Sequence, residues 1–224
     1  MSLSPSLVRS FEEYIERFMS EQQAPGMAVA IAKGEDVIYA KAFGLRDQEN
    51  QLPVTTETIF GIASITKPFT AAAIAQLAEQ GKLSFDDPLV KFLPSFKLPD
   101  GSQGEITLHH LMSHTTGIPP LPTLGYSIRG NTVPDPREDG NKPEIAVEEP
   151  RMNTVDDVMK YMSTMEEKLF GKPGEYFSYS NDSYGLLGKV VTAVSGVPYQ
   201  QYIRDNILAP LGMTRSLFSY EELT

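Results

Sequence analysis

Apolar residues near the start of the chain recur at the spacing of an amphipathic α-helix. They are preceded by Ser4, a typical capping residue, and by Pro5, which suits a first helical turn. Ala24-Pro25-Gly26 ends the pattern. The sequence therefore predicts a helix whose apolar stripe consists of Leu7, Val8, Phe11, Tyr14, Ile15, Phe18 and Met19.

A β-hairpin is predicted directly after this helix. Residues 27–32 and 37–40 are largely apolar, and residues 33–36 between them have the composition of a turn. Because two strands alone are marginally stable in water, the hairpin needs helices or further strands packed against it.

The rest of the regular pattern is mainly helical, so the chain is predicted to be an α+β protein that is rich in helices. The apolar stripe of the stretch from Asp182 to Ser195 comprises Leu186, Leu187, Val190, Val191 and Val194. Helices are predicted over Ile65–Gln80, from Thr107 to near Thr116-Gly117, and over Val155–Lys168, Asp182–Ser195 and Tyr199–Leu208, with a short extended piece at 216–220.

Residues 118–153 follow neither a helical nor a strand period. Seven prolines interrupt these 36 residues. A connection of this length without regular structure is usually a lid, a binding loop or a disordered segment.

Composition narrows the function classes. With 224 residues, of which 41% are hydrophobic and 21% charged, the chain is long enough to bury a core. Its formal net charge of −10 would repel a phosphate backbone, so nucleic acid is not an expected partner. The longest nearly apolar stretch, Gly26–Ala32, is far shorter than the roughly 20 residues of a membrane span, and no span is expected.

The chain contains no cysteine, which excludes a disulfide framework, a thiolate zinc site and a cysteine nucleophile. The first charged residues, Arg9, Glu12 and Glu13, do not form the basic leader of a secretory signal. Met1-Ser2-Leu3 is also typical of a vector-derived leader that replaces a natural one, so the compartment stays unknown.

The first motif with chemical potential is Ser64-Ile65-Thr66-Lys67, directly before Pro68, a residue that a helix tolerates in its first turn. Residues three apart share a helix face, so the Ser64 hydroxyl and the Lys67 amine are within reach of each other. Serine becomes a nucleophile when a neighbour accepts its proton, and a lysine kept neutral by desolvation or by nearby positive charge does so. Alone, the pattern also describes a capping serine and a solvated lysine.

A second motif, Tyr179-Ser180-Asn181, follows more than a hundred residues later, just ahead of a predicted helix. A tyrosine relays protons, and an asparagine amide both donates to and accepts from a substrate amide. Alone, this motif also describes a surface turn in which Asn181 or Asp182 caps the next helix. The signal is the occurrence of both motifs in this order.

With these motifs the chain resembles the serine β-lactamase and penicillin-binding-protein superfamily, in particular the branch of class C β-lactamases, D-alanyl-D-alanine carboxypeptidases and related esterases. The resemblance covers nearly the whole chain, through Ala24-Pro25-Gly26, Phe60-Gly-Ile-Ala-Ser-Ile-Thr-Lys67, His110-Leu-Met-Ser-His-Thr-Thr-Gly-Ile118, Pro173-Gly174, Tyr179-Ser-Asn181 and Pro210-Leu-Gly-Met213. It implies a β-lactamase/transpeptidase-like fold. Residues 1–62 would form the N-terminal helix and hairpin of an α/β part, 63–181 a helical domain with the long loop 118–153, and 182–224 helices that return to the α/β part.

The resemblance also implies a role for each site residue. Ser64 looks like the acylated nucleophile, Lys67 like its activating amine and Tyr179 like a second proton-transfer group. The backbone N–H of Ser64 would supply half of an oxyanion hole. Asn181 looks like a contact to the substrate amide, and Tyr126 lies in the loop where family members build much of their substrate pocket. No cofactor or metal is required.

One family feature has no counterpart after Asn181. It is the third motif, Lys-Thr-Gly or His-x-Gly, whose strand supplies the other oxyanion donor; Lys172-Pro173-Gly174 matches it by letter only. We therefore expect the sequence to correspond to about the first two-thirds of a family member, without the C-terminal strands of the fold. A partner chain, a swapped segment or another copy is then expected to cover the open edge of the hairpin, and the chain alone is expected to be catalytically crippled.

Two other groups of residues match functional patterns in part. His110 and His114 are four apart, as in zinc-protease helices, but Leu111 stands where His-Glu-x-x-His has its glutamate, so a structural role at the helix end is preferred. Glu166-Glu167 is similar to the deacylating glutamate of class A β-lactamases, but its place in an amphipathic helix favours a solvated helix face.

The leading hypothesis is a serine hydrolase that forms an acyl-enzyme on Ser64 with an amide, lactam or ester, as a D-amino-acid peptidase, a β-lactamase or an esterase. Its substrate would be a small molecule or a peptide. The alternative is a non-catalytic binding or assembly module of the same fold. A purely structural helical domain, the third option, would leave Ser64, Lys67, Tyr179 and Asn181 scattered.

Overall fold

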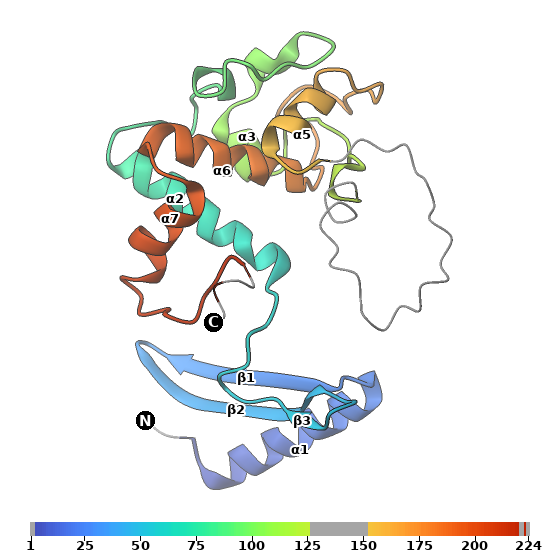
Figure 1. Ribbon diagram of the computed structural model, residues 1–224, viewed down its shortest axis with the longest axis vertical. Coiled ribbons are helices and arrows are strands. Elements are labelled where there is room, and N and C mark those ends of the chain that lie inside the picture. The colour runs from blue at the N-terminus through green and yellow to red at the C-terminus, as the bar shows by residue number, and fades with distance from the viewer. Residues whose placement is uncertain (1–2, 126–151, 220–221, 223–224) are drawn as a thin grey trace. The chain divides into compact units, whose positions relative to one another are not determined.

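The computed structural model describes residues 3–125, 152–219 and 222. Helices are combined with one small antiparallel sheet (Figure 1), so the predicted α+β class is confirmed. The chain divides into two compact units. One comprises the described residues of Met1–Gly61 and Arg215–Leu217, and the other those of Ile62–Thr214 and Phe218–Thr224.

The first unit consists of one helix and the sheet. Helix α1 spans Pro5–Gln22, and the Ser4 side chain accepts a hydrogen bond from the Leu7 N–H at its start, as the sequence predicts. Strand β1 (Gly26–Lys33) pairs antiparallel with β2 (Asp36–Asp47), which confirms the hairpin. Beyond the predicted run, β2 continues to Asp47 because its last residues pair with a short third strand, β3 (Leu52–Pro53).

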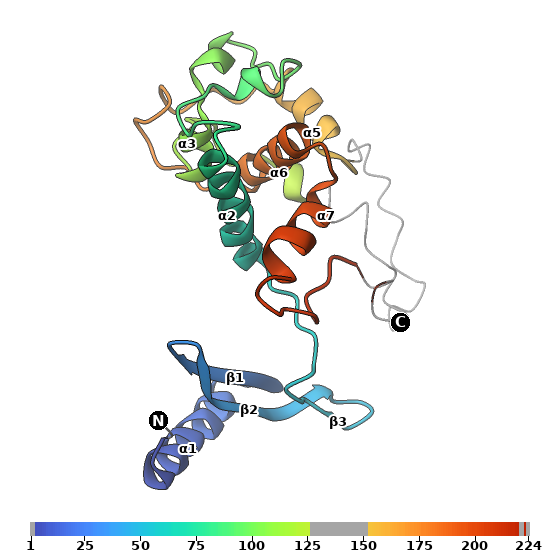
Figure 2. The ribbon, with the colours of Figure 1, turned by 90° about the vertical axis from the view of Figure 1, so that its left-hand side faces the viewer.

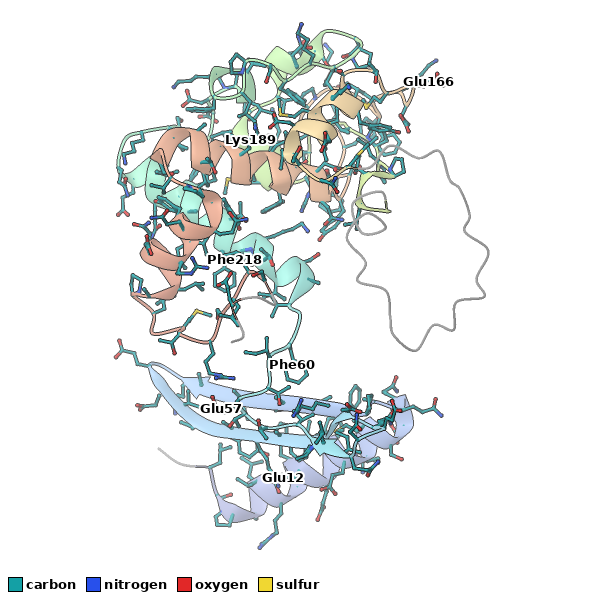
Figure 3. The ribbon with its side chains drawn as sticks, in the orientation of Figure 1. Glu12, Glu57, Phe60, Glu166, Lys189 and Phe218 are labelled. Atoms are coloured by element: carbon teal, nitrogen blue, oxygen red, sulfur yellow. The ribbon has the colours of Figure 1, made fainter. Side chains whose placement is uncertain are left out.

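Helix α1 packs against the hairpin and supplies the support that two strands require. The Phe11 ring meets the Tyr39 ring of β2 edge to face, with 5.5 Å between centroids. The Glu12 carboxylate (Figure 3) accepts hydrogen bonds from the Tyr39 hydroxyl at 3.1 Å and from the Lys41 amine at 2.7 Å. The strand order is β1-β2-β3, so among the described residues the outer edge of β1 has no paired strand.

The second unit is a bundle of helices around an apolar core. Helix α6 contacts α2, α3, α5 and α7, because the predicted stripe of Leu186, Leu187, Val190 and Val191 is buried against them. The views in Figures 1 and 2 both show α2, α6 and α7 side by side. The helices are α2 (Thr66–Glu79), α3 (Leu108–Met112), α5 (Val155–Met162), α6 (Asn181–Ser195) and α7 (Tyr199–Ile203), with 3₁₀ turns at Ala63–Ile65, Leu89–Lys91 and Ser102–Glu105 and a π turn at Arg204–Leu208.

None of the helices in the described part of the chain is both long enough and apolar enough to cross a membrane.

Helix α5 ends earlier than the sequence predicts. The predicted helix over Val155–Lys168 stops at Met162, where the hydroxyls of Ser163 and Thr164 donate to the carbonyls of Lys160 and Tyr161. The chain then turns so that Met165 is buried. The expectation that Glu166-Glu167 lies on a helix face is therefore wrong, and the Glu167 carboxylate instead accepts a hydrogen bond from the Tyr161 hydroxyl.

Helix α3 also ends early, at Met112, and the following turn brings two distant loops together. Gly117 has a left-handed backbone (φ +80°), and a Cβ added there would overlap the carbonyl oxygen of Gly171. The Phe170 N–H donates to the Gly117 carbonyl at 2.8 Å. This close approach fixes residues 170–174 beside the end of α3, only a few residues ahead of Tyr179.

We expect Gly117→Ala to lower the free energy of unfolding more than Gly101→Ala does. Gly101 has nearly the same φ (+79°), but an added Cβ would meet nothing within 4 Å. Gly101→Ala therefore costs only the left-handed backbone of alanine, about 1–2 kcal/mol, while Gly117→Ala adds the overlap with Gly171. Urea denaturation followed by circular dichroism measures both. Equal losses in the two variants would contradict the close approach at Gly117.

Candidate active site

The first motif lies where a 3₁₀ turn leads into helix α2. The turn Ala63–Ile65 carries Ser64, which is exposed, and the first turn of α2 carries Lys67 and Pro68. Pro68 fits there because a first-turn N–H has no partner within the helix. The Lys67 Nζ donates to the Ser64 Oγ at 3.2 Å. The Ser-x-x-Lys spacing thus places the amine beside the hydroxyl.

The second motif lies directly against the first. The Tyr179 hydroxyl donates to the Ser64 Oγ at 2.7 Å, across 115 positions of sequence. The Lys67 Nζ donates to the Asn181 Oδ1 at 2.7 Å, across 114 positions. The side chains of Ser64, Lys67, Tyr179 and Asn181 therefore form one hydrogen-bonded cluster within the second unit, and they are not scattered.

An extended segment ahead of α6 directs Tyr179 toward Ser64. In extended backbone, successive side chains point to opposite sides. Ser178 and Ser180 are accordingly buried, whereas Tyr179 between them is 44% exposed. The Ser180 Oγ accepts from the Ser183 N–H and caps α6, a role that the turn alternative gave to Asn181 or Asp182. Asn181 is thereby left as the first residue of α6, with its side chain toward Lys67.

The Lys67 ammonium shapes the electrostatics of the cluster. Its Nζ lies 4.7 Å from the centroid of the Tyr179 ring and 5.6 Å from that of the Tyr184 ring. The neighbouring Lys67 amine, together with the Ser64 hydroxyl, holds the pKa of the Tyr179 phenol below its usual value. Burial raises the pKa of Tyr184. Of these two phenols, Tyr179 is the one whose ionised form is favoured.

The cluster opens into a pocket of about 820 Å³ between α2, α6 and α7. Thr70 and Tyr199 line it, and their hydroxyls share a hydrogen bond of 2.7 Å. Gly185 and Gly188 on α6 also line it, and the Tyr199 ring and Val155 pack close to their backbone. Lys189 (Figure 3) and Asp156 also line it, and they form an ion pair of 2.7 Å. The pocket has the size and concave shape of a small-molecule site.

The remaining predicted site residues have different outcomes. Tyr126 lies outside the described residues. His114 does not face His110 across a metal site, because its ring accepts a hydrogen bond from the Ser180 N–H. Among the described residues, no group of three or more His, Asp or Glu side chains is arranged to hold a metal ion.

Several residues around the cluster were not singled out from the sequence. They are Thr70, Tyr184 and Tyr199. A helical signal was available for Tyr184, because Asn181, Tyr184, Gly185 and Gly188 share one face of a helix that begins at Asn181. No local signal points to Tyr199, which reaches the pocket only through the packing of α7.

Comparison with known proteins identifies the family. The family model described as Beta-lactamase matches residues 11–222. The chain belongs to the beta-lactamase family. Protein flp of Staphylococcus aureus (strain MW2) is 33% identical to it over 211 residues, which are 94% of this chain and 38% of flp. The resemblance found in the sequence is thereby confirmed.

Two solved structures agree with this beta-lactamase assignment. The octameric penicillin-binding protein homologue from Pyrococcus abyssi superposes with a TM-score of 0.79 at 42% identity, over 96% of this chain and 45% of the homologue. EstCE1, described as a hydrolase with promiscuous acyltransferase activity, gives a TM-score of 0.71 at 30% identity, over 92% of this chain and 52% of EstCE1. The chain thus spans about half, or less, of the length of these relatives.

We expect the lowered pKa of Tyr179 to depend on Lys67. Absorbance at 295 nm, recorded against pH for the protein and for its Tyr179→Phe variant, isolates this one phenol by difference. In the wild type it should ionise below its ordinary pKa of about 10, and in Lys67→Met its pKa should rise, because the amine no longer stabilises the phenolate. Lys189→Met, which removes another lysine of the same pocket, should leave it unchanged. A Tyr179 titration that is the same in Lys67→Met and the wild type would contradict this assignment.

Proposed function

We propose that this member of the beta-lactamase family is a serine hydrolase that forms an acyl-enzyme on Ser64. The observation that carries the proposal is the position of the Ser64 Oγ, within hydrogen-bond distance of both the Lys67 Nζ and the Tyr179 hydroxyl. A serine hydroxyl becomes nucleophilic when an adjacent base takes its proton, and two candidate bases are adjacent here.

The proposed acylation step begins with loss of the hydroxyl proton. A neutral Lys67 amine or a Tyr179 phenolate accepts it while Oγ bonds to the substrate carbonyl carbon. The carbonyl electrons move to oxygen, and the backbone N–H of Ser64 donates to that oxyanion. When the tetrahedral intermediate collapses, the protonated base gives its proton to the departing nitrogen or oxygen, and the acyl group remains on Ser64.

Deacylation reverses these roles. The base that has lost its proton to the leaving group now takes one from a water or an acceptor alcohol, and the resulting oxygen nucleophile attacks the acyl carbonyl. The proton returns to the Ser64 Oγ as the ester bond breaks. Through its Oδ1, Asn181 holds the Lys67 amine, and its Nδ2 amide is proposed to donate to a substrate carbonyl.

We propose amides, lactams and esters of small molecules or peptides as the substrate class. The pocket beside Ser64 accommodates a molecule of that size. Two relatives support the same range of chemistry, one as a penicillin-binding protein homologue and the other as a hydrolase with acyltransferase activity. A peptidase, a lactamase and an esterase differ in the group that leaves during acylation and in the molecule that accepts the acyl group. Formation of the acyl-enzyme on Ser64 is common to all three.

A non-catalytic binding or assembly module is the second candidate. It is favoured by the outer edge of β1, which has no paired strand among the described residues and is the kind of edge that another strand or another copy covers. The octameric assembly of the Pyrococcus abyssi homologue is in line with self-association.

Ser64→Ala should abolish the covalent adduct that the purified chain forms with a fluorescent penicillin or a fluorophosphonate. Intact-mass spectrometry reads the adduct, because the acyl or phosphonyl group adds a defined mass. Ser102→Ala, a serine in a 3₁₀ turn away from the pocket, is the matched control and should keep it. Because the chain alone is expected to be catalytically crippled, the decisive sample is a longer chain that also includes the family's C-terminal strands. If that longer chain gives no adduct with either probe, the binding module becomes the better interpretation.

For Lys67→Ala we expect at least a hundredfold lower acylation rate constant with the fold retained, since proton transfer contributes about 10²–10⁴-fold in such reactions. Stopped-flow fluorescence with the same penicillin measures the rate, and circular dichroism checks the fold. Lys82→Ala, just beyond the other end of α2, is the control. An unchanged rate would remove Lys67 from the mechanism and leave Tyr179 as the base.

A further inference from the structure

His114 holds the segment that carries Tyr179 at two points. Its backbone carbonyl accepts a hydrogen bond from the Ser178 N–H at 2.8 Å. Its ring Nδ1 accepts one from the Ser180 N–H at 3.1 Å. One residue just beyond α3 therefore binds the backbone on both sides of Tyr179.

The His114 ring also packs against the reactive face of the site. It lies 4.5 Å from the Tyr179 ring, with an angle of 34° between the planes, and 5.1 Å from the Tyr184 ring. The Tyr184 hydroxyl donates to the Met112 carbonyl at 2.9 Å, which ties this ring to α3 as well. The two phenols in contact with His114 are the two whose rings lie beside the Lys67 amine.

The backbone of His114 is unusual in a way that serves this contact. Its φ is +59°, a left-handed conformation that non-glycine residues adopt only where the surroundings hold it. Within the described part of the second unit, Ala63 is the other such non-glycine residue, and it directly precedes Ser64. The left-handed turn ends α3 and directs the His114 carbonyl toward Ser178.

The protonation state of His114 agrees with its acceptor role. The residue is buried, and burial, with a smaller effect of the Lys67 charge, lowers the pKa of its ring. A neutral ring that carries its proton on Nε2 leaves Nδ1 free to accept from Ser180. Since Ser180 is itself buried, its N–H would otherwise have no water to bind.

We propose that His114 is a positioning residue for acylation, which holds the Tyr179 hydroxyl at the Ser64 Oγ through its hydrogen bonds to Ser178 and Ser180. The inference rests on the proposed function, because it assigns Tyr179 a proton to carry. It also gives the imidazole at this position a role: the ring supplies an acceptor for a buried N–H and a flat surface for two phenols.

Three substitutions at His114 separate the effect of its side-chain acceptor from that of its left-handed backbone. His114→Asn keeps an acceptor, Oδ1, at the same number of bonds from Cα as Nδ1, and asparagine tolerates a left-handed backbone. His114→Gly tolerates the backbone but has no acceptor. His114→Gln retains an amide but places its acceptor one bond farther out. His109→Asn, at an exposed position on α3, is the control.

Two readouts are taken for each variant: the acylation rate constant at saturating fluorescent penicillin, and the Tyr179 pKa from 295 nm difference titration. For His114→Gly we expect a loss of about ten- to hundredfold in acylation, the effect of one unpaired buried donor, and a rise of the Tyr179 pKa toward its ordinary value. His114→Asn should stay within about threefold of the wild type, as a retained acceptor predicts. The control should match the wild type in both readouts.

The titration keeps this test independent of catalysis. If the chain forms no acyl-enzyme, the proposed function fails. A Tyr179 pKa that rises in His114→Gly and stays at the wild-type value in His114→Asn would still support the positioning role. If His114→Gly unfolds, the comparison of His114→Asn with His114→Gln decides, because only asparagine places an acceptor where Nδ1 lies. An unshifted Tyr179 pKa in His114→Gly, or equal behaviour of Asn and Gln, would overturn the proposal.

Discussion

The arrangement of the site depends on one charged side chain that bridges two helices. The Lys67 amine donates to Ser64 at the start of its own helix and to Asn181 at the start of α6. Such a bridge forms only if α2 and α6 pack closely. The two helices are in contact, and Ala73 of α2 belongs to the same buried core as Leu186 and Val190 of α6. The same packing that stabilises the unit therefore sets the geometry around the Ser64 hydroxyl.

A second constraint acts on the segment between α3 and α6. Residues 170–180 lie far along the sequence from α3 but contact the turn that follows it. Gly117 meets Gly171 there, and His114 binds the backbone on both sides of Tyr179. Both contacts require backbone conformations that most residues avoid. Glycine adopts such a conformation freely, whereas at His114 it costs free energy and persists because the surrounding residues hold it.

All the groups of the proposed mechanism belong to the second unit. Ser64, Lys67, Tyr179, Asn181 and the pocket beside them lie within Ile62–Thr214. The first unit contributes a hairpin packed on α1, with one edge of β1 unpaired among the described residues. Relatives such as protein flp extend well beyond the matched region. The residues proposed for proton transfer therefore all lie in the helical unit.

Local pattern alone determined much of this protein. Periodicity predicted α1, the hairpin, α2 and α6, because a helix or strand with one buried face imposes its period on the sequence. The motifs Ser64–Lys67 and Tyr179–Asn181 were recognisable in the amino-acid sequence, and they indicated the family. Local pattern did not determine where α5 stops, since the hydroxyls of Ser163 and Thr164 and the burial of Met165 override its helical period. Nor did it determine that His114 turns toward Ser180, 66 positions away, or that Tyr179 reaches Ser64. Contacts of that range are set by how helices pack around a shared core, and only the tertiary structure decides them.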